Sequence, residues 1–254
     1  MYFDEKVFND YSIDYEIGEN SDKIFDTDAI VVSPGISPNS YVLKKAVSKN
    51  IKILSEVEVS SYFCKVPIIA ITGTNGKTTT TELTGAILKE AGYDVHVCGN
   101  VGLAFSEIIS KLGSNSIVVL ETSSFQLEYT FAFKPKVAMI LNITPDHIDW
   151  HGGYDNYVNA KLKIIRNQNN DDIAIINFDD NLLQTKIAEI HSIVGAFSKG
   201  KILNDKIALK CFLEDDDICY MEKSAERIIN KNDINLRGTH NLMNAMAAIL
   251  AVKK

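Results

Sequence analysis

Residues 68–83 read IIAITGTNGKTTTTEL, and this segment is the strongest indication of the fold in the sequence. An uninterrupted apolar run, typical of a buried strand, leads into a turn that contains Gly73 and Gly76, and a helix-like segment follows over 78–91. This order directs backbone N–H groups and the positive end of a helix toward an anion. The stretch departs from the usual phosphate loop, G-x-x-x-x-G-K-[ST], because Ile71 stands where the first glycine belongs.

The loop carries the groups that a nucleotide phosphate needs. Lys77 can reach the outer phosphates, and the Thr78 hydroxyl is placed to bind Mg²⁺. The alternative is a tight strand-to-helix turn with a threonine-rich start, since Gly-Lys-Thr alone also occurs by chance. Strand, loop and helix together favour a nucleotide site with a shortened loop. The residues predicted to bind it are Gly73, Thr74, Asn75, Gly76, Lys77, Thr78 and Thr79.

Short apolar runs alternate with helix-period segments along the chain. Strands are predicted at 29–32, 51–54, 67–71, 95–97, 117–120, 137–141 and 173–176, and helices at 41–49, 78–91, 103–112, 154–166, 182–190 and 239–254. Strands that are apolar throughout and separated by helices form parallel sheets covered on both faces, so the predicted fold class is α/β with a mostly parallel sheet. The alternating pattern of residues 207–229 predicts an antiparallel hairpin at the edge of the sheet.

Composition narrows the class of protein. The chain has 254 residues and a formal net charge of −7, so no nucleic-acid partner is expected, although a local cationic site for a phosphorylated ligand remains possible. No apolar run approaches the ~18 residues of a spanning helix, and the acidic N-terminus lacks a signal-peptide pattern. The four cysteines form no C-x-x-C pair. We expect a cytoplasmic monomer with free thiols and no membrane partner.

Both ends of the sequence predict a piece of a longer protein. Residues 1–10 enter without an obvious first element, and the helix at 239–254 has no stop signal after it.

Three further positions carry groups suited to phosphate and metal chemistry. Glu121 follows the strand at 117–120, at the strand end where ligands bind in open α/β sheets; it could hold Mg²⁺ or serve only as a polar strand end. Asp146, His147 and His151 could suggest zinc, but no third distal ligand is evident, and a capped turn is the alternative. Lys161 would by default be a solvated helix residue.

Several of these stretches carry a family resemblance. The loop resembles the ATP loop of the Mur ligases and the related folylpolyglutamate synthases. Other matching stretches are VSPGI (32–36), CGNVG (98–102), ETSSFQLE (121–128), LNITPDHID (141–149), YVNAK (157–161), and GTHN (238–241) with Asn244. The resemblance covers essentially the whole chain, and SSFQLE together with TPDH is similar to the members that add D-glutamate.

The resemblance implies two domains and a reaction. Residues 1–62 would be a partial, Rossmann-like domain for the UDP-linked substrate, and 63–254 a P-loop central domain that binds ATP; a C-terminal domain for D-glutamate would be absent. With ATP and Mg²⁺, the family's D-glutamate-adding members phosphorylate the carboxylate of UDP-N-acetylmuramoyl-L-alanine, and D-glutamate then attacks the acyl phosphate. The fragment itself is expected to be inactive. The alternatives are another Mur or folylpolyglutamate-type ligase and a non-catalytic nucleotide-binding module.

The resemblance also implies roles for single residues. Glu121 and Thr78 would hold Mg²⁺, His147 a second Mg²⁺ with support from Asp146, and Lys161, as a carbamate, would bridge the metals. Lys163 is not favoured in place of Lys161, because residues i and i+2 do not share a helical face. Asn100 would face the acceptor carboxylate. Asn241 would lie near adenine, or else serve only the start of its helix. The implied catalytic set is Lys77, Asn100, His147 and Lys161, and Ser33, Pro34 and Gly35 would line the uridine-nucleotide region.

Overall fold

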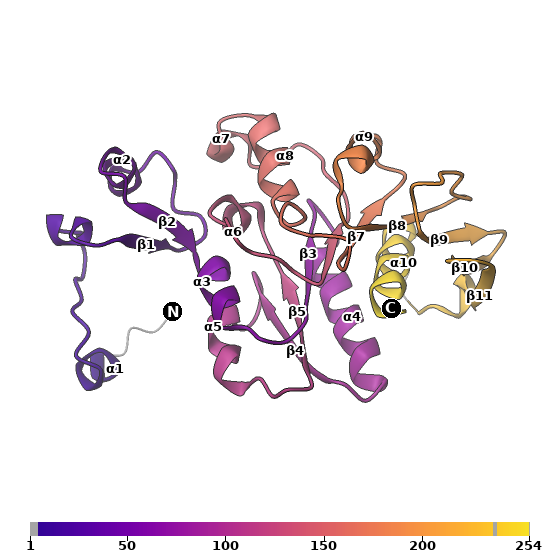
Figure 1. The fold of residues 1–254 in the computed structure, drawn as a ribbon, viewed down its shortest axis with the longest axis horizontal. Coiled ribbons are helices and arrows are strands. Elements are labelled where there is room, and N and C mark those ends of the chain that lie inside the picture. The colour runs from indigo at the N-terminus through magenta and orange to yellow at the C-terminus, as the bar shows by residue number, and fades with distance from the viewer. Residues whose placement is uncertain (1–4, 236–237, 254) are drawn as a thin grey trace.

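The computed structural model describes residues 5–235 and 238–253 and is built around a nine-stranded sheet (Figure 1). Its strand order is β11-β10-β9-β8-β7-β6-β3-β5-β4. The strands are β3 (Ile68–Thr72), β4 (Asp94–Gly99), β5 (Ser116–Glu121), β6 (Val137–Ile140), β7 (Ile173–Asn177), β8 (Ile193–Ser198), β9 (Leu209–Glu214), β10 (Asp217–Met221) and β11 (Ala225–Asn230).

Pairing along this sheet is parallel from β4 to β9, and β10 is antiparallel to both β9 and β11. The predicted mostly parallel α/β fold and the predicted antiparallel edge are therefore confirmed. Strand β3 lies inside the sheet, and all its residues are buried. Ile68 and Ala70 pack into one core and Ile69 and Ile71 into another, since successive side chains of a strand point to opposite faces.

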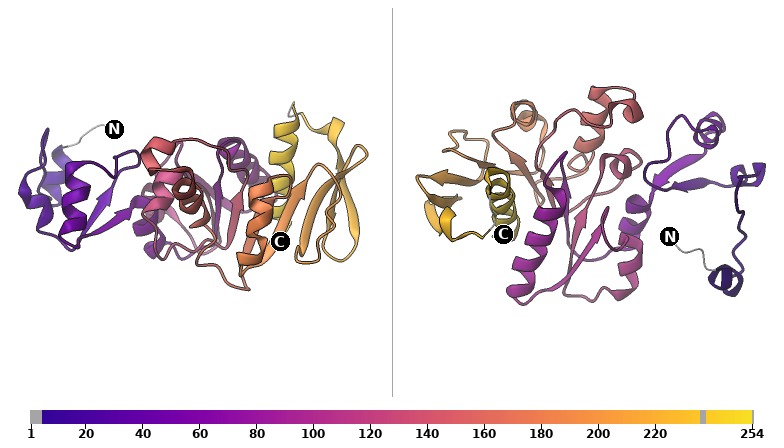
Figure 2. Two further views of the ribbon diagram at one scale, coloured as in Figure 1. Left: turned by 90° about the horizontal axis from the view of Figure 1, so that it is seen from above. Right: turned by 180° about the vertical axis from the view of Figure 1, so that it is seen from behind.

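Helices cover both faces of the sheet (Figure 2). Helices α4 (Lys77–Glu90) and α10 (Thr239–Val252) contribute Leu88, Met246 and Leu250 to one core. The other core receives side chains from α3 (Glu56–Phe63), α5 (Phe105–Ile108), α6 (Ser124–Glu128), α8 (Tyr154–Leu162) and α9 (Asn181–Lys186). Among the described residues, no helix is both long and apolar enough to cross a membrane.

A smaller unit precedes this sheet, at the indigo end of the chain in Figure 1. Its parallel strands β1 (Ala29–Val32) and β2 (Lys52–Ser55) pack with α2 (Tyr41–Ser48) around a small core that includes Phe25, Leu43 and Ile53. Helix α1 (Glu5–Asp10) lies apart from this pair of strands. Helix α3 begins directly after β2 and joins the unit to the larger sheet.

Several elements were not predicted from the sequence. Strand β8 and helices α3, α6 and α7 (Ile148–His151) were missed. Helix α3, with the sequence EVEVSSYF, alternates polar and apolar residues as a strand does, but the Ser55 side chain caps it by accepting from the Glu58 N–H. The predicted helices at 103–112 and 154–166 are shorter, ending their α-helical parts at Ile108 and Leu162. Helix α10 ends at Val252; residue 254, where the prediction ended, lies outside the described residues.

Candidate active site

The loop between β3 and α4 explains why Ile71 replaces the expected glycine. Ile71 still belongs to β3 and is fully buried in the core beneath the sheet, so the turn begins only at Gly73. Gly76, the residue before α4, has a φ of 85°, and a Cβ there would lie 2.5 Å from Asn244 Oδ1. Glycine is therefore required at the second position but has no use at the first. The loop is a shorter strand-to-helix connection that still opens α4.

Lys77 folds back onto the loop that precedes it. Its Nζ donates to the carbonyl oxygens of Gly73 and Thr74, each at 3.0 Å. Burial lowers its pKa, while Glu121 and Asp146 act in the opposite direction. Among the described residues no carboxylate is in hydrogen-bond contact with this ammonium group, which suits a cation that receives an anionic ligand.

Lys161 reaches the same carbonyl from the other side. Its side chain is only 2% exposed, and Nζ donates to Gly73 O at 2.7 Å and lies 4.8 Å from the centre of the Tyr157 ring. Burial, with a further contribution from Lys77, lowers its pKa to about 7. Much of the amine is therefore neutral at physiological pH, and the default expectation of a solvated lysine is wrong.

Asn100 and Glu121 form a pair at the ends of neighbouring strands. Asn100 Nδ2 donates to Glu121 Oε1 at 2.9 Å, and the Asn100 N–H donates to the Glu121 carbonyl at 2.9 Å. Gly99, the last residue of β4, has a φ of 119°, and a Cβ there would lie 2.1 Å from the Glu121 carbonyl oxygen. Only glycine permits this close approach, which brings the Asn100 amide over the buried carboxylate.

His147 occupies the turn before α7 in a left-handed conformation, with a φ of 50°. Its N–H donates to Asp146 Oδ1 at 2.9 Å, its Nε2 lies 3.5 Å from Asp146 Oδ2, and its ring centre lies 4.8 Å from that of Phe125. The Asp146 carboxylate thus lies beside the imidazole, and its support of a metal-binding His147 stays a prediction.

These side chains meet at a cavity of about 150 Å³. Lys77, Asn100, His147 and Lys161 all line it, together with Gly73, Thr74, Ser123, Ser124, Phe125, Asp146 and Tyr157. Glu121 lies behind Asn100, and the Tyr157 hydroxyl is 2.9 Å from Thr74 Oγ1. Sequence reasoning did not assign roles to Ser124, Phe125 or Tyr157, although each lies inside a stretch that carried the resemblance.

The groups around the cavity can accommodate Mg²⁺ but do not form a closed metal cage. Within residues 5–235 and 238–253, no three His, Cys, Asp or Glu side chains form a group that could hold a metal ion. Magnesium usually takes one or two protein ligands and completes its shell with water and phosphate oxygens. The exposed Thr78 hydroxyl and the Glu121 carboxylate are oxygen donors of that kind.

A larger cavity of about 900 Å³ adjoins the loop on its other side. Asn75, Gly76 and Thr79 line it from the loop and α4, and Asn241 and Asn244 from the first turns of α10. Asn244 Nδ2 donates to Asn241 Oδ1 at 3.3 Å. Asn241, which was predicted to lie near adenine, therefore lies across this cavity from the loop at 73–79.

Asn142, which the sequence analysis did not single out, holds the tip of the loop. Its Oδ1 accepts from the Asn75 N–H at 2.9 Å, and its Nδ2 donates to the Asn75 carbonyl at 3.0 Å. This paired contact resembles that between two strands, and it orders the loop from the end of β6. A polar residue directly after an apolar strand was the signal available in the sequence.

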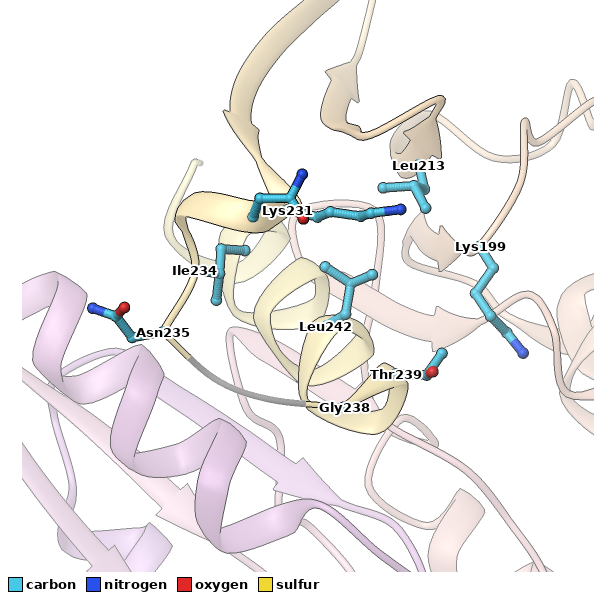
Figure 3. Close-up of a pocket in the computed structure, with 9 residues that line it drawn as sticks. Lys199, Leu213, Lys231, Ile234, Asn235, Gly238, Thr239 and Leu242 are labelled. Carbon is cyan, nitrogen blue, oxygen red and sulfur yellow. The ribbon is translucent and has the colours of Figure 1, made fainter.

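A neighbouring hollow of about 720 Å³, shown in Figure 3, opens beside the start of α10. It shares Lys199 and Thr239 with the larger cavity and is also lined by Lys231, whose Nζ lies 2.6 Å from Asp216 Oδ1.

At the opposite side of the molecule, Ser33, Pro34 and Gly35, which were predicted to line the uridine-nucleotide region, follow β1 in a turn where Gly35 has a φ of 89°.

Known proteins are similar to this chain in both sequence and fold. Residues 71–252 match the Mur ligase middle domain, and residues 3–42 match the MurD N-terminal domain. The UDP-N-acetylmuramoylalanine–D-glutamate ligase of Natranaerobius thermophilus is 41% identical over 246 residues, covering 92% of this chain and 51% of the relative. The enzyme of the same name from Caldicellulosiruptor bescii is 43% identical over 222 residues, or 87% of this chain and 48% of the relative.

Solved structures agree on the fold. A UDP-N-acetylmuramate:L-alanyl-gamma-D-glutamyl-meso-diaminopimelate ligase from Neisseria meningitides aligns with a TM-score of 0.62 at 17% identity, over 98% of this chain and 81% of that one. A UDP-N-acetylmuramoyl-L-alanyl-D-glutamate–2,6-diaminopimelate ligase aligns with a TM-score of 0.59 at 20% identity, over 84% of this chain and 55% of that one. The chain spans about half the length of the curated relatives it matches. By its matched domains and its relatives, the chain belongs to the Mur ligase family.

Proposed function

We propose that this chain carries the ATP-binding and carboxylate-activating part of a ligase that adds D-glutamate to UDP-N-acetylmuramoyl-L-alanine. The observation that supports this most strongly is the pair Lys77 and Lys161, both hydrogen-bonded to the Gly73 carbonyl at the edge of one cavity. The cation of Lys77 and the buried amine of Lys161 at one loop would suit a site where two anions, the ATP γ-phosphate and the acceptor carboxylate, must meet. Because ATP drives the reaction, we place the protein in the cytoplasm.

In the proposed reaction, the acceptor carboxylate oxygen attacks the γ-phosphorus, and the bond to the ADP oxygen breaks. The amine of D-glutamate then attacks the acyl phosphate carbon, forming the amide and releasing phosphate and a proton. Lys77 would move from the loop carbonyls to the outer phosphates, and the Asn100 amide would orient the acceptor. Mg²⁺, when bound at Thr78, Glu121 and His147, would neutralise phosphate charge.

Within this function, residues 1–62 would serve the UDP-linked substrate and residues 63–254 would bind ATP. The loop residues 73–79 would cradle the phosphates, and the cavity of about 900 Å³ would take the adenosine, with Asn241 near the base. Support for this assignment comes from the position of that cavity, between the phosphate loop and the start of α10.

Lys161 is proposed to act as a carbamate. The neutral amine would attack CO₂, forming an N–C bond and releasing a proton, so that a cation becomes an anionic oxygen ligand. A lysine whose pKa is lowered to about 7 has the neutral form that this reaction requires.

Titration with ¹³C-labelled bicarbonate, followed by ¹³C NMR, tests the carbamate. We expect one carbamate resonance that Lys161→Met removes and Lys163→Arg retains. A resonance that survives in Lys161→Met would exclude Lys161 as the modified residue.

Calorimetric titration with MgATP tests the nucleotide site. Lys77→Ala should weaken ATP binding at least about tenfold, because it removes a charge-assisted contact to phosphate. The matched control is Lys89→Ala, on the exposed face of the same helix, which should bind as the wild type does. Equal affinity in wild type and Lys77→Ala would sink the phosphate-loop assignment.

The second candidate is a non-catalytic nucleotide-binding module, which the loop at 73–79 and the adjoining cavity of about 900 Å³ would also suit. Formation of ADP that depends on UDP-N-acetylmuramoyl-L-alanine and D-glutamate separates the two. ATP binding without such turnover is expected of this chain by itself, and turnover would exclude the module.

A further inference from the structure

His151 ends α7, one helical turn after His147, and the proposed reaction gives it no role. Its side chain is 8% exposed, and its Nε2 lies 3.0 Å from the Oγ of Ser124, the first residue of α6. Because Ser124 lines the cavity of about 150 Å³, the orientation of the buried His151 imidazole affects the hydroxyl that faces this cavity.

Three aromatic rings hold the His151 ring in place. It stacks on Phe125 with ring centres 5.7 Å apart and an angle of 8°, and it meets Trp150 and Tyr157 edge-on at 4.6 and 5.4 Å. Burial, with nearby cationic groups, lowers its pKa to about 4, so the ring is neutral at physiological pH. A neutral imidazole has one N–H donor and one acceptor nitrogen, and its direction is set here by packing.

Ser124 is the available hydroxyl of the two adjacent serines. Ser123 caps α6: its Oγ accepts from the Gln126 N–H and donates to Gln126 Oε1, so its hydrogen bonds are used within the helix turn. Ser124, in contrast, is 3% exposed and makes its side-chain hydrogen bond to His151, as far as the described residues show. It also lines the cavity of about 150 Å³ that Lys77 and Lys161 share.

We infer that His151 is a positioning residue: its Nε2–H donates to Ser124 Oγ and thereby turns the Ser124 hydroxyl hydrogen toward an oxygen of the outermost phosphate in the cavity. This inference rests on the proposed function, because it needs a nucleotide phosphate at the loop. A serine hydroxyl has one hydrogen and two lone pairs. When a fixed donor occupies one lone pair, the hydrogen is free to point at an anion. Lys77, which in the proposed function would move to the outer phosphates, lines the same cavity as Ser124.

Binding of two nucleotides separates this contact from the rest of the site. ADP lacks the outermost phosphate, and the imido analogue of ATP has it but is not cleaved. Ser124→Ala and His151→Phe should each weaken binding of the analogue about tenfold, the effect of one hydrogen bond to a charged group, and leave ADP binding within about twofold. His151→Gln should restore most of the affinity, because its amide nitrogen can take the place of Nε2.

The double variant tests whether His151 acts through Ser124. Adding His151→Phe to Ser124→Ala should cause no further loss of affinity for the analogue, since the hydroxyl is already gone. Losses that multiply, or a His151→Phe chain with wild-type affinity for the analogue, would overturn the inference. His151→Phe keeps an aromatic ring among its neighbours, and circular dichroism checks that it folds.

Nitrogen NMR of the nucleotide-free chain gives an independent readout, which a merely structural ring would not require. We expect His151 to be neutral with the proton on Nε2, and a proton on Nδ1 would overturn the inference, because Ser124 would then have to donate to the ring. If the wild type bound neither nucleotide, the proposed function would fail and this inference with it. If the wild type binds both nucleotides and His151→Phe binds the analogue as tightly as the wild type does, only the positioning role is overturned and the proposed function stands.

Discussion

Two fully buried ionisable residues, Glu58 and Lys161, differ in how their surroundings satisfy them. Glu58, on the helix that joins the two sheets, is 0% exposed and accepts from the N–H groups of Phe131, Ala132 and Phe133 at 2.8–3.0 Å and from the Tyr62 hydroxyl at 2.8 Å. Lys161 donates to the Gly73 carbonyl and has the cation of Lys77 nearby.

The difference separates a buried group that hydrogen bonds satisfy from one that burial destabilises as a cation. A buried carboxylate whose oxygens are satisfied by four donors makes the surrounding backbone depend on it. A buried ammonium with an acceptor on one side and a like charge on the other is destabilised as a cation, and it can lose its proton or be modified. Burial is common to the two residues, and the number of hydrogen-bond partners is what distinguishes them.

The largest effect is expected at the satisfied charge. Glu58→Ala leaves three backbone N–H groups without an acceptor, at roughly 1–3 kcal/mol each, so the free energy of unfolding should fall by about 3 kcal/mol or more. Urea unfolding followed by the fluorescence of Trp150, the single tryptophan of the chain, measures it. A fall of less than about 1 kcal/mol in the free energy of unfolding would mean that the backbone N–H groups do not depend on the Glu58 carboxylate.

The opposite behaviour is expected at Lys161. Between the folded-state pKa of about 7 and the ordinary lysine pKa of 10.5, the unfolded chain binds a proton that the folded chain lacks, so the wild type gains stability as the pH rises. Below pH 7 both states are protonated and the full cost of burying the ammonium remains.

Lys161→Met removes that cost. Its stability relative to the wild type should be greatest at acidic pH and should decline by on the order of 1–2 kcal/mol between pH 6.5 and 8.5. Unfolding in buffers free of CO₂ and Mg²⁺ measures this difference, and parallel pH profiles for the two chains would contradict it.

The smallest effect sharpens the comparison within the Glu58 cluster. Tyr62→Phe removes one donor to Glu58 and leaves the three backbone donors in place, so unfolding should cost only about 1 kcal/mol less than in the wild type. The Tyr62 ring is more than half exposed, so little packing changes. A loss as large as that of Glu58→Ala would show that the tyrosine, not the backbone, holds the carboxylate.

Much of the fold could be predicted from local sequence, because its strands are short, apolar and bounded by turn residues. Strand β8 was missed although it contains Val194 and Phe197, since glycine and serine interrupt its apolar pattern. Helix α3 was missed because its alternation imitates a strand, and the Ser55 cap and contacts with neighbouring elements decide in favour of a helix.

The candidate site could be predicted residue by residue only where a motif marked it. The loop at 73–79, Glu121 and His147 were each indicated by their position after a strand or by a resembling stretch. Asn142 lay in a resembling stretch without a predicted role, and His151 was considered only as a zinc ligand. The contacts they make are with residues elsewhere in the chain: Asn75 for Asn142 and Ser124 for His151.

Periodicity and neighbouring residues were enough to predict the parallel sheet, the strand–loop–helix at 68–90 and the residue types at the carboxyl ends of the strands. Folding in three dimensions was needed to bring Lys161 to the Gly73 carbonyl, 88 positions away, where Lys77 also donates. It was likewise needed to bring Glu58 to a turn 73–75 positions away. Burial, partner count and shifted pKa values arise from such distant contacts, which no local pattern encodes.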